Sequence, residues 1–172
     1  SMVGKEIGGK TERRKEIGNL CMMHPDVFVA QTTCAHTNHF YKAVMAANEY
    51  PGPAVINVFT TCQPEHGVAD DMAMHQAKLA ADSRAFPVFI YDPTKGSRFS
   101  ERLSLQGNPA KNNDWYVNPK TKEQIDFTSF AKTEGRFSKH FDKDGNPDEL
   151  ILTAQEHQLA NWRLLQELAG VI

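Results

Sequence analysis

No long run of hydrophobic residues occurs among these 172 residues, and the sequence indicates neither a transmembrane segment nor a signal peptide. Excess charge of one sign is also missing, because 19 Lys and Arg stand against 21 Asp and Glu. A near-neutral chain is a poor partner for nucleic acid, whose binding depends on many phosphate contacts. The three cysteines are too few and odd in number for a complete disulfide framework. We therefore expect a cytoplasmic protein with free thiols that binds neither membrane nor nucleic acid.

Several common catalytic motifs are absent as well. The sequence contains no Gly-x-Gly-x-x-Gly, no Gly-x-Ser-x-Gly and no His-Glu-x-x-His. It therefore carries none of the usual signatures of dinucleotide binding, serine hydrolases or zinc proteases. The chain is nevertheless long enough to form one domain with a buried core.

What is present is a regular alternation of strand and helix patterns in the first half of the chain. Apolar, β-branched runs predict strands at 27–30, 53–61 and 86–91. Helices are predicted between them, at 39–49 and 70–84, from the spacing of apolar residues. This alternation is typical of an α/β protein with a parallel sheet, helices on both faces and right-handed crossovers.

The second half of the chain has a different character. Residues 94–129 are polar and rich in Gly, Asn, Lys and Pro, so we expect an irregular extension that wraps over the sheet or against a neighbouring subunit. A short helix is predicted near 129–137 and a last helix at 153–168. The chain thus divides into an α/β part, 3–93, and an extension that ends in a helix, 94–172.

Cys62 stands where the second predicted strand ends, before a turn and the next helix. Ligands gather outside the carboxyl ends of strands in open α/β sheets, so a thiol at this point is well placed to hold a metal centre. The simpler alternative is a small apolar residue buried at a strand end. Cys34 follows the preceding strand and lies near Cys62 if the two strands are neighbours. Cys21 sits among apolar residues and is interpreted as a packing residue.

A zinc site is a further alternative for the same two loops. The candidate ligands are Cys34, His36, His39, Cys62 and His66. Structural zinc sites usually contain a tight pair such as Cys-x-x-Cys, which does not occur here. Helix capping and solvent exposure are the commoner roles for these histidines.

Short motifs follow one another in a fixed order between Gly8 and Pro93. They are the basic Gly9-Lys10 loop, the strand at 27–30, Ala-Ala-Asn-Glu-Tyr-Pro-Gly-Pro at 46–53, Thr-Thr-Cys at 60–62, Gly67, the helix around 75–80 and Tyr-Asp-Pro at 91–93. This series resembles the C-terminal part of the thiamine-diphosphate domain of pyruvate:ferredoxin (or flavodoxin) oxidoreductases and their 2-oxoacid:acceptor relatives. The resemblance implies half of a thiamine-diphosphate-binding fold, while the extension from Thr94 matches only loosely.

The resemblance also implies a role for Cys62. In that family a 4Fe–4S cluster lies close to thiamine diphosphate, and its last cysteine ligand matches the position of Cys62. The other three cluster cysteines do not occur here, nor do the Gly-Asp-Gly segment that supports Mg²⁺ and the diphosphate and the Asn-Thr-Gly-Gly stretch that follows it. The opening stretch, 3–18, has no apolar face, which agrees with a cut through a domain. We therefore interpret the chain as a fragment that does not by itself retain thiamine diphosphate, Mg²⁺ or the cluster.

The intact protein implied by the resemblance is a 2-oxoacid oxidoreductase, with pyruvate as the first candidate substrate. Such an enzyme decarboxylates the 2-oxoacid on thiamine diphosphate, passes electrons through 4Fe–4S clusters to ferredoxin or flavodoxin, and forms an acyl-coenzyme A. The expected partners are the remaining chain or subunits, in a homodimer, and the fragment alone is expected to be inactive. The alternative is a non-catalytic α/β assembly or interaction module that has lost the cofactor loops and uses the extension 94–172 as its contact surface.

Overall fold

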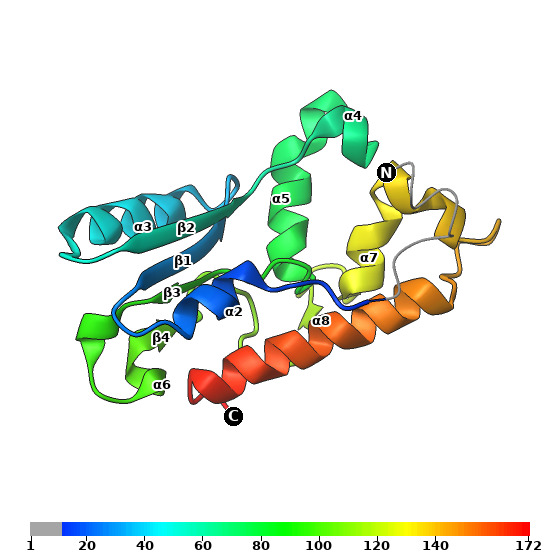
Figure 1. Cartoon of the computed structure of the whole chain (residues 1–172). Helices are drawn as coiled ribbons and strands as arrows, with labels where there is room; N and C mark the ends of the chain where they lie inside the picture. Colours follow the sequence, from blue (N-terminus) through cyan, green and yellow to red (C-terminus); the bar gives the residue numbers. More distant parts are fainter. Residues whose placement is uncertain (1–11) are drawn as a thin grey trace.

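A four-stranded sheet forms the centre of the computed structural model, which describes residues 12–172 (Figure 1). The Gly9-Lys10 motif and most of the opening stretch lie outside these residues. The strands run in the order β2-β1-β3-β4, and their bounds are β1 Phe28–Thr33, β2 Ala54–Phe59, β3 Phe89–Tyr91 and β4 Leu103–Ser104.

One face of the sheet is covered by α3 (Thr37–Glu49), which lies along β1 and β2 in Figure 1. Successive residues of a strand point to opposite faces, so Phe28 and Ala30 of β1 both point toward this helix. They pack there with Ala43, and all three side chains are fully buried. The small alanine lets the helix approach the strands closely.

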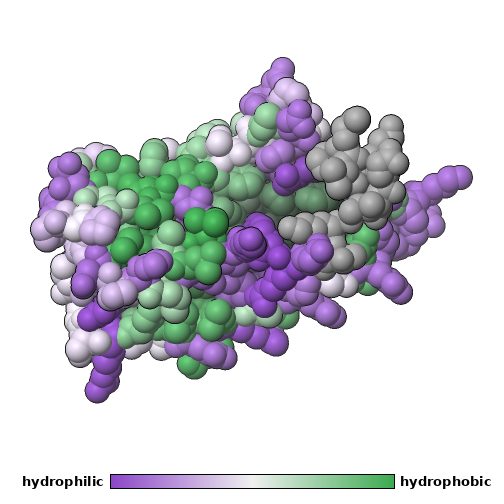
Figure 2. Space-filling model, viewed as in Figure 1, coloured by the Kyte–Doolittle hydropathy of each residue, from purple (hydrophilic) through white to green (hydrophobic). Residues whose placement is uncertain are grey.

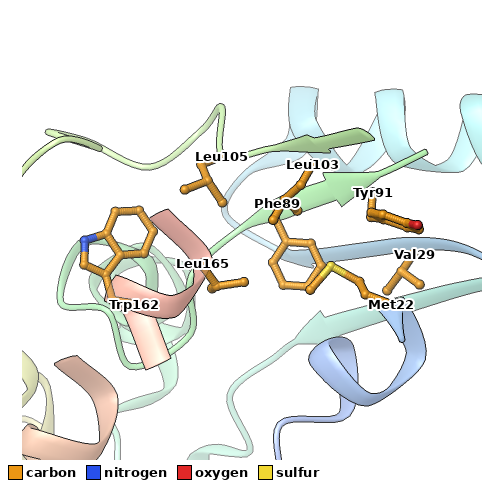
Figure 3. Packing of buried hydrophobic residues seen from close by; sticks show 8 residues of the cluster. All are labelled: Met22, Val29, Phe89, Tyr91, Leu103, Leu105, Trp162 and Leu165. Carbon is orange, nitrogen blue, oxygen red and sulfur yellow. The ribbon is translucent and has the colours of Figure 1, made fainter. Parts of the chain in front are cut away.

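The opposite face carries a larger apolar cluster, which Figure 3 shows from close by. Val29, which lies between Phe28 and Ala30, points to this side. The cluster joins the sheet to α2 (Ile17–Met22) and to α8 (Glu149–Leu168), whose Trp162 is fully buried. Both parts of the chain that the sequence distinguishes, before and after residue 93, therefore contribute to one core.

The expected α/β class, with helices on both faces and a C-terminal helix, is confirmed, but the sheet is mixed rather than parallel. Only β1 and β2 run parallel, whereas β3 is antiparallel to β1 and β4 is antiparallel to β3. The expectation that the third strand extends a parallel sheet is therefore wrong. The reason is the position of α5 (Ala73–Asp82), which stands beyond the carboxyl ends of β1 and β2 in Figure 1 and does not return along the sheet. The chain consequently enters β3 at Phe89, opposite Gln31 near the carboxyl end of β1.

A second apolar core forms where α5 meets α7 (Phe127–Lys132) and the beginning of α8. Ala77, Ala80 and Ala81 of α5 are fully buried, and their small side chains allow the helices to pack closely. Aromatic residues of α7 fill the space between the helices. The buried members of this cluster are Ala80, Ala85, Phe127, Phe130, Ala131 and Ile151.

The remaining elements are short. They are α4 (Gln63–His66), η1 (Asp70–Met72), η2 (Pro93–Lys95), α6 (Phe99–Arg102), β5 (Tyr116–Val117), β6 (Gln124–Ile125) and η3 (Gly135–His140). The predicted short helix near 129–137 thus corresponds to α7 followed by η3. None of the helices within residues 12–172 has both the length and the apolar character needed to cross a bilayer.

The helices near the two ends of the described chain differ from the sequence-based predictions. The last helix begins at Glu149 rather than near 153, because Asp148 caps it and accepts from the N–H groups of Leu150 and Ile151 at 3.0 and 3.1 Å. At the other end, α2 lies where no helix was predicted, and only its first two residues belong to the opening stretch 3–18. Gly18 is buried in this helix against Phe89. A Cβ at this position would lie 2.7 Å from the Phe89 ring, so the close contact requires glycine.

Arg84 fastens the polar extension to the rest of the fold. Its side chain is fully buried, and its guanidinium lies 4.0 Å above the indole of Trp162. It donates hydrogen bonds to the backbone carbonyls of Pro109, Ala110 and Asp114 at 2.8 to 3.2 Å. Burial lowers the pKa of Arg84 to about 10, so the side chain keeps its charge at neutral pH.

Candidate functional site

The carboxyl ends of β1 and β2 lie side by side, as the sequence predicts for Cys34 and Cys62. The N–H of Cys34 donates to the carbonyl of Phe59, the last residue of β2, at 3.1 Å. Cys62 follows three residues later and is exposed, whereas Cys34 is half-buried. Cys21 packs against the apolar cluster that contains Val29 and Trp162, on the face of the sheet that α3 does not cover. Its interpretation as a packing residue is therefore confirmed.

Cys62 stands immediately before α4, a single helical turn that projects from the sheet (Figure 1). The carbonyl of Cys62 accepts from the N–H of His66 at 2.9 Å, and the N–H of Val68 donates to Gln63 at 3.0 Å. The turn ends at Gly67, whose φ of 64° lies in the left-handed region that glycine adopts without strain. The exposed Cys62 therefore lies at the start of a short turn that two backbone hydrogen bonds hold together.

The two histidines after β1 turn back onto the strand. His36 Nδ1 and Thr33 Oγ1 are hydrogen-bonded at 2.8 Å, and His39 Nδ1 and Thr32 Oγ1 at 3.0 Å. Burial lowers the pKa of His36. Burial, aided by His36 and Lys42, lowers the pKa of His39 to about 4. Both rings are therefore neutral at pH 7 and act as hydrogen-bonded parts of the strand end.

A zinc site does not form from these residues. Within residues 12–172, no group of three or more His, Cys, Asp and Glu side chains is arranged to hold a metal ion. His36 and His39 bond to threonines, and His66 points toward a carboxylate rather than toward Cys62. The zinc hypothesis is therefore wrong for the part of the chain that the structure describes.

A polar network centred on a buried carboxylate supports the loop that follows Cys62, and no sequence motif predicted it. At its centre is Glu134, whose side chain is fully buried. Glu134 accepts from Gln76 Nε2 at 3.1 Å, pairs with Arg136, and lies 3.5 Å from Nδ1 of His66. Burial and the positive charge of Arg136 lower the pKa of His66, against the opposing effect of Glu134. These residues are separated by up to 70 positions, so no local pattern could have revealed them.

One cysteine thiolate can supply one ligand to an iron–sulfur cluster, and Cys62 fits that part. Its thiol is exposed beyond a strand end, where a group bound to other parts of a larger protein could reach it. Around it, the described residues provide no group of three or more His, Cys, Asp and Glu side chains that could hold a metal ion. They therefore fit a single ligand contributed to a shared cluster and do not fit a complete site for either cofactor.

Comparison with known proteins identifies relatives along nearly the whole chain. Pyruvate-flavodoxin oxidoreductase of Rhodospirillum rubrum is 29% identical over 169 residues, which is 96% of this chain and 13% of that protein. Pyruvate synthase subunit PorB of Thermotoga maritima is 26% identical over 171 residues, which is 98% of this chain and 46% of the subunit. Ketoisovalerate oxidoreductase subunit VorB of Pyrococcus abyssi is 26% identical over 168 residues, which is 98% of this chain and 47% of the subunit.

No protein-family model matches the chain. The chain spans less than half the length of each of these three relatives. The relatives nevertheless agree with the resemblance seen in the motifs from Gly8 to Pro93, and they extend it through the C-terminal helix. Along nearly all of its length, the chain is therefore similar to parts of proteins named pyruvate-flavodoxin oxidoreductase, pyruvate synthase and ketoisovalerate oxidoreductase.

Proposed function

We propose that this chain is part of an oxidoreductase that oxidatively decarboxylates a 2-oxoacid and forms an acyl-coenzyme A. The proposal rests on relatives named for pyruvate and for ketoisovalerate, which are both 2-oxoacids. In the intact enzyme, thiamine diphosphate with Mg²⁺ would carry the carbanion chemistry, and 4Fe–4S clusters would pass electrons to ferredoxin or flavodoxin. Pyruvate is the first substrate to test.

Within this enzyme, Cys62 would be one ligand of a 4Fe–4S cluster. The observation that carries this assignment is an exposed thiol just beyond the end of β2, in a segment that matches the family motif. When bound, such a cluster supplies one-electron transfer. The chain's own contribution is to hold the Cys62 thiol at the surface of the sheet's carboxyl edge, on a short turn anchored at both ends.

The open edge of the sheet supports a role as one piece of a larger assembly. Among the described residues, β2 has a strand partner on one side only, which leaves the backbone groups of its other side unpaired. Val58 on this strand is exposed, and so are Ile17 and Leu20 on the adjacent α2 and Val44 on α3. Figure 2 shows a broad apolar surface over the region of α3, β2 and α2. Exposed apolar surface of this kind marks an interface, which we assign to the remaining part of the oxidoreductase.

The second candidate is a non-catalytic assembly or interaction module. The same apolar edge favours it, because a docking surface needs no cofactor. The two candidates differ in whether the complete polypeptide or complex that contains this chain binds iron and thiamine diphosphate. The chain alone is expected to release no CO₂ from pyruvate with added thiamine diphosphate, Mg²⁺ and coenzyme A.

The deciding experiment replaces Cys62 in the complete enzyme, prepared without oxygen. Cys62→Ser should remove about four iron atoms per chain and one cluster signal from the electron paramagnetic resonance spectrum. The matched control is Cys34→Ser, at the neighbouring strand end, which should retain all the iron. Full iron content in Cys62→Ser would refute the ligand assignment. An intact protein free of iron and of thiamine-dependent activity would favour the assembly module.

A further inference from the structure

The loop that carries Cys62 lies in close contact with η3, a segment nearly 70 residues further along the chain. The N–H of Gly135 donates to the carbonyl of Gly67 at 3.2 Å, so η3 is hydrogen-bonded directly to the end of α4. A Cβ at Gly67 would lie 2.8 Å from the Cα of Gly135, and a Cβ at Gly135 would lie 3.1 Å from the oxygen of Gly67. A side chain at Gly67 would clash with the opposite backbone, and one at Gly135 would make a contact tighter than most, so the close approach favours glycine on both sides.

The adjacent residue, Glu134, ties the same junction to a third element. Its carboxylate receives a hydrogen bond from Gln76 of α5 and pairs with Arg136 of η3. Gln76 is itself held by Thr133, whose hydroxyl donates to Gln76 Oε1 at 2.8 Å. Glu134 and Gln76 are buried, so breaking the bond between them would leave polar groups without water or partners, which is costly.

The other end of the Cys62 loop is fastened by aromatic packing to the same region. Phe59, the last residue of β2, lies with its ring centre 6.2 Å from that of Phe130 on α7, in an edge-to-face arrangement. Its ring is also 6.4 Å from that of His66 on α4. The segment from Phe59 to Gly67 is therefore held at its start by α7 and at its end by η3, with Cys62 between the two anchors.

We propose that Glu134 and Gly135 are positioning residues, which fix the Cys62 loop from the C-terminal extension. This inference deepens the proposed function, on which its relevance to the cluster rests. The extension, residues 94–172, therefore does more than cover the sheet, because it determines where the Cys62 thiol is presented. Neither residue touches the cluster in this scheme, and both act through Gly67 and His66.

The first test needs no cofactor and uses hydrogen exchange of the full chain. Gly135→Ala adds only a methyl group at a position without positive φ, so it breaks the close approach without backbone strain. The amides of His66 and Val68 should exchange about tenfold faster or more, while the amide of Val29 in the core should stay protected. The matched control is Gly52→Ala at the other end of β2, where the added methyl group would lie 2.6 Å from the Tyr50 ring and away from the Cys62 loop.

Glu134→Gln keeps the size of the side chain and should also speed exchange at His66 and Val68. It is the second variant if Gly135→Ala fails to fold. Unchanged exchange at both amides in a folded Gly135→Ala or Glu134→Gln protein would overturn the proposal. Faster exchange at Val29 to the same extent would overturn it too, because the effect would then be a global loss of stability.

The second test applies the same variants to the complete, iron-loaded enzyme. Gly135→Ala should shift the reduction potential or the electron paramagnetic resonance spectrum of one cluster, and Gly52→Ala should not. A cluster that survives Cys62→Ser would refute the ligand assignment alone, and the hydrogen-exchange result would still decide whether the extension holds the loop. Unaltered spectra in Gly135→Ala, together with loss of a cluster in Cys62→Ser, would refute the positioning role and leave the ligand intact.

Discussion

Buried charged side chains attach the C-terminal extension to the α/β part at two places, and the bonds at the two places differ in kind. Beside Trp162, the buried guanidinium of Arg84 donates to backbone carbonyls of the loop at 109–114. Beside α4, the buried carboxylate of Glu134 meets side chains, namely those of Gln76 and Arg136. Backbone acceptors cannot turn away without moving the chain, whereas side chains can change rotamer.

Because of this difference, we expect one attachment to affect the free energy of unfolding of the whole chain and the other to affect mainly the order of the loop after β2. We expect the Arg84 attachment to determine how firmly the whole fold holds together, because it lies against the largest buried side chain, Trp162. The Glu134 attachment should govern the loop after β2 more than the fold. A region near a ligand site is commonly among the less stable parts of a protein, and its order then depends on a few specific contacts.

The largest effect is expected from Arg84→Met. The substitution removes the cation–π contact and leaves the carbonyls of Pro109, Ala110 and Asp114 without donors, which should lower the free energy of unfolding by about 2–4 kcal/mol. Urea unfolding measures the change. The control is Arg163→Met, which removes an exposed pair with Asp114 and should cost much less. Equal losses in both variants would contradict the special role of the buried side chain.

A smaller loss is expected from Glu134→Gln. Without the negative charge, the exposed Arg136 loses its ion-pair partner, and the free energy of unfolding should fall by only about 0.5–1 kcal/mol. Glu65→Gln, on the exposed side of the same loop, should leave the urea midpoint almost unchanged. The comparison between the two attachments fails if Glu134→Gln destabilises the chain more than Arg84→Met does.

The strand end beside the site should make stability depend on pH. Because His39 has a pKa of about 4 in the fold and an ordinary value near 6.5 when unfolded, the unfolded chain binds more protons between these values. Stability should therefore rise with pH from about 4 to about 6.5 and be lost as pH falls through that window. His39→Gln should flatten this rise in urea midpoints measured between pH 5 and pH 7. The exposed His24 serves as the control, and His24→Gln should leave the slope as it is.

The smallest effect on stability is expected at the outer edge of the sheet, away from both attachments. Val58→Lys places a charge on an edge strand where the side chain is already 37% exposed, so the free energy of unfolding should change by about 0.5 kcal/mol or less. Association with the remaining part of the oxidoreductase should nevertheless weaken strongly, as measured by co-purification. Val117→Lys, on an exposed strand of the extension, is the matched control. Unimpaired association in Val58→Lys would exclude this edge as the interface.

Local patterns in the sequence were enough to locate most of the first half of the fold. The apolar runs around Val29 and Ile56 gave both parallel strands, and apolar spacing gave α3, α5 and the terminal helix to within a few residues. The position of Cys62 beyond a strand end followed from the same patterns. Periodicity succeeds here because each of these elements buries one continuous face, and the alternation of side chains along a strand or helix records that burial directly.

Contacts between distant residues decided the rest. The antiparallel course of β3 depends on where α5 stands relative to the sheet, which no pattern within either element specifies. The approach of Gly67 to Gly135 and the bond between Gln76 and Glu134 join positions about 60 residues apart or more. None of these residues belongs to a local sequence pattern that indicates its partner. A sequence records the face that an element buries, but only the assembled fold determines which distant backbone comes to lie against it.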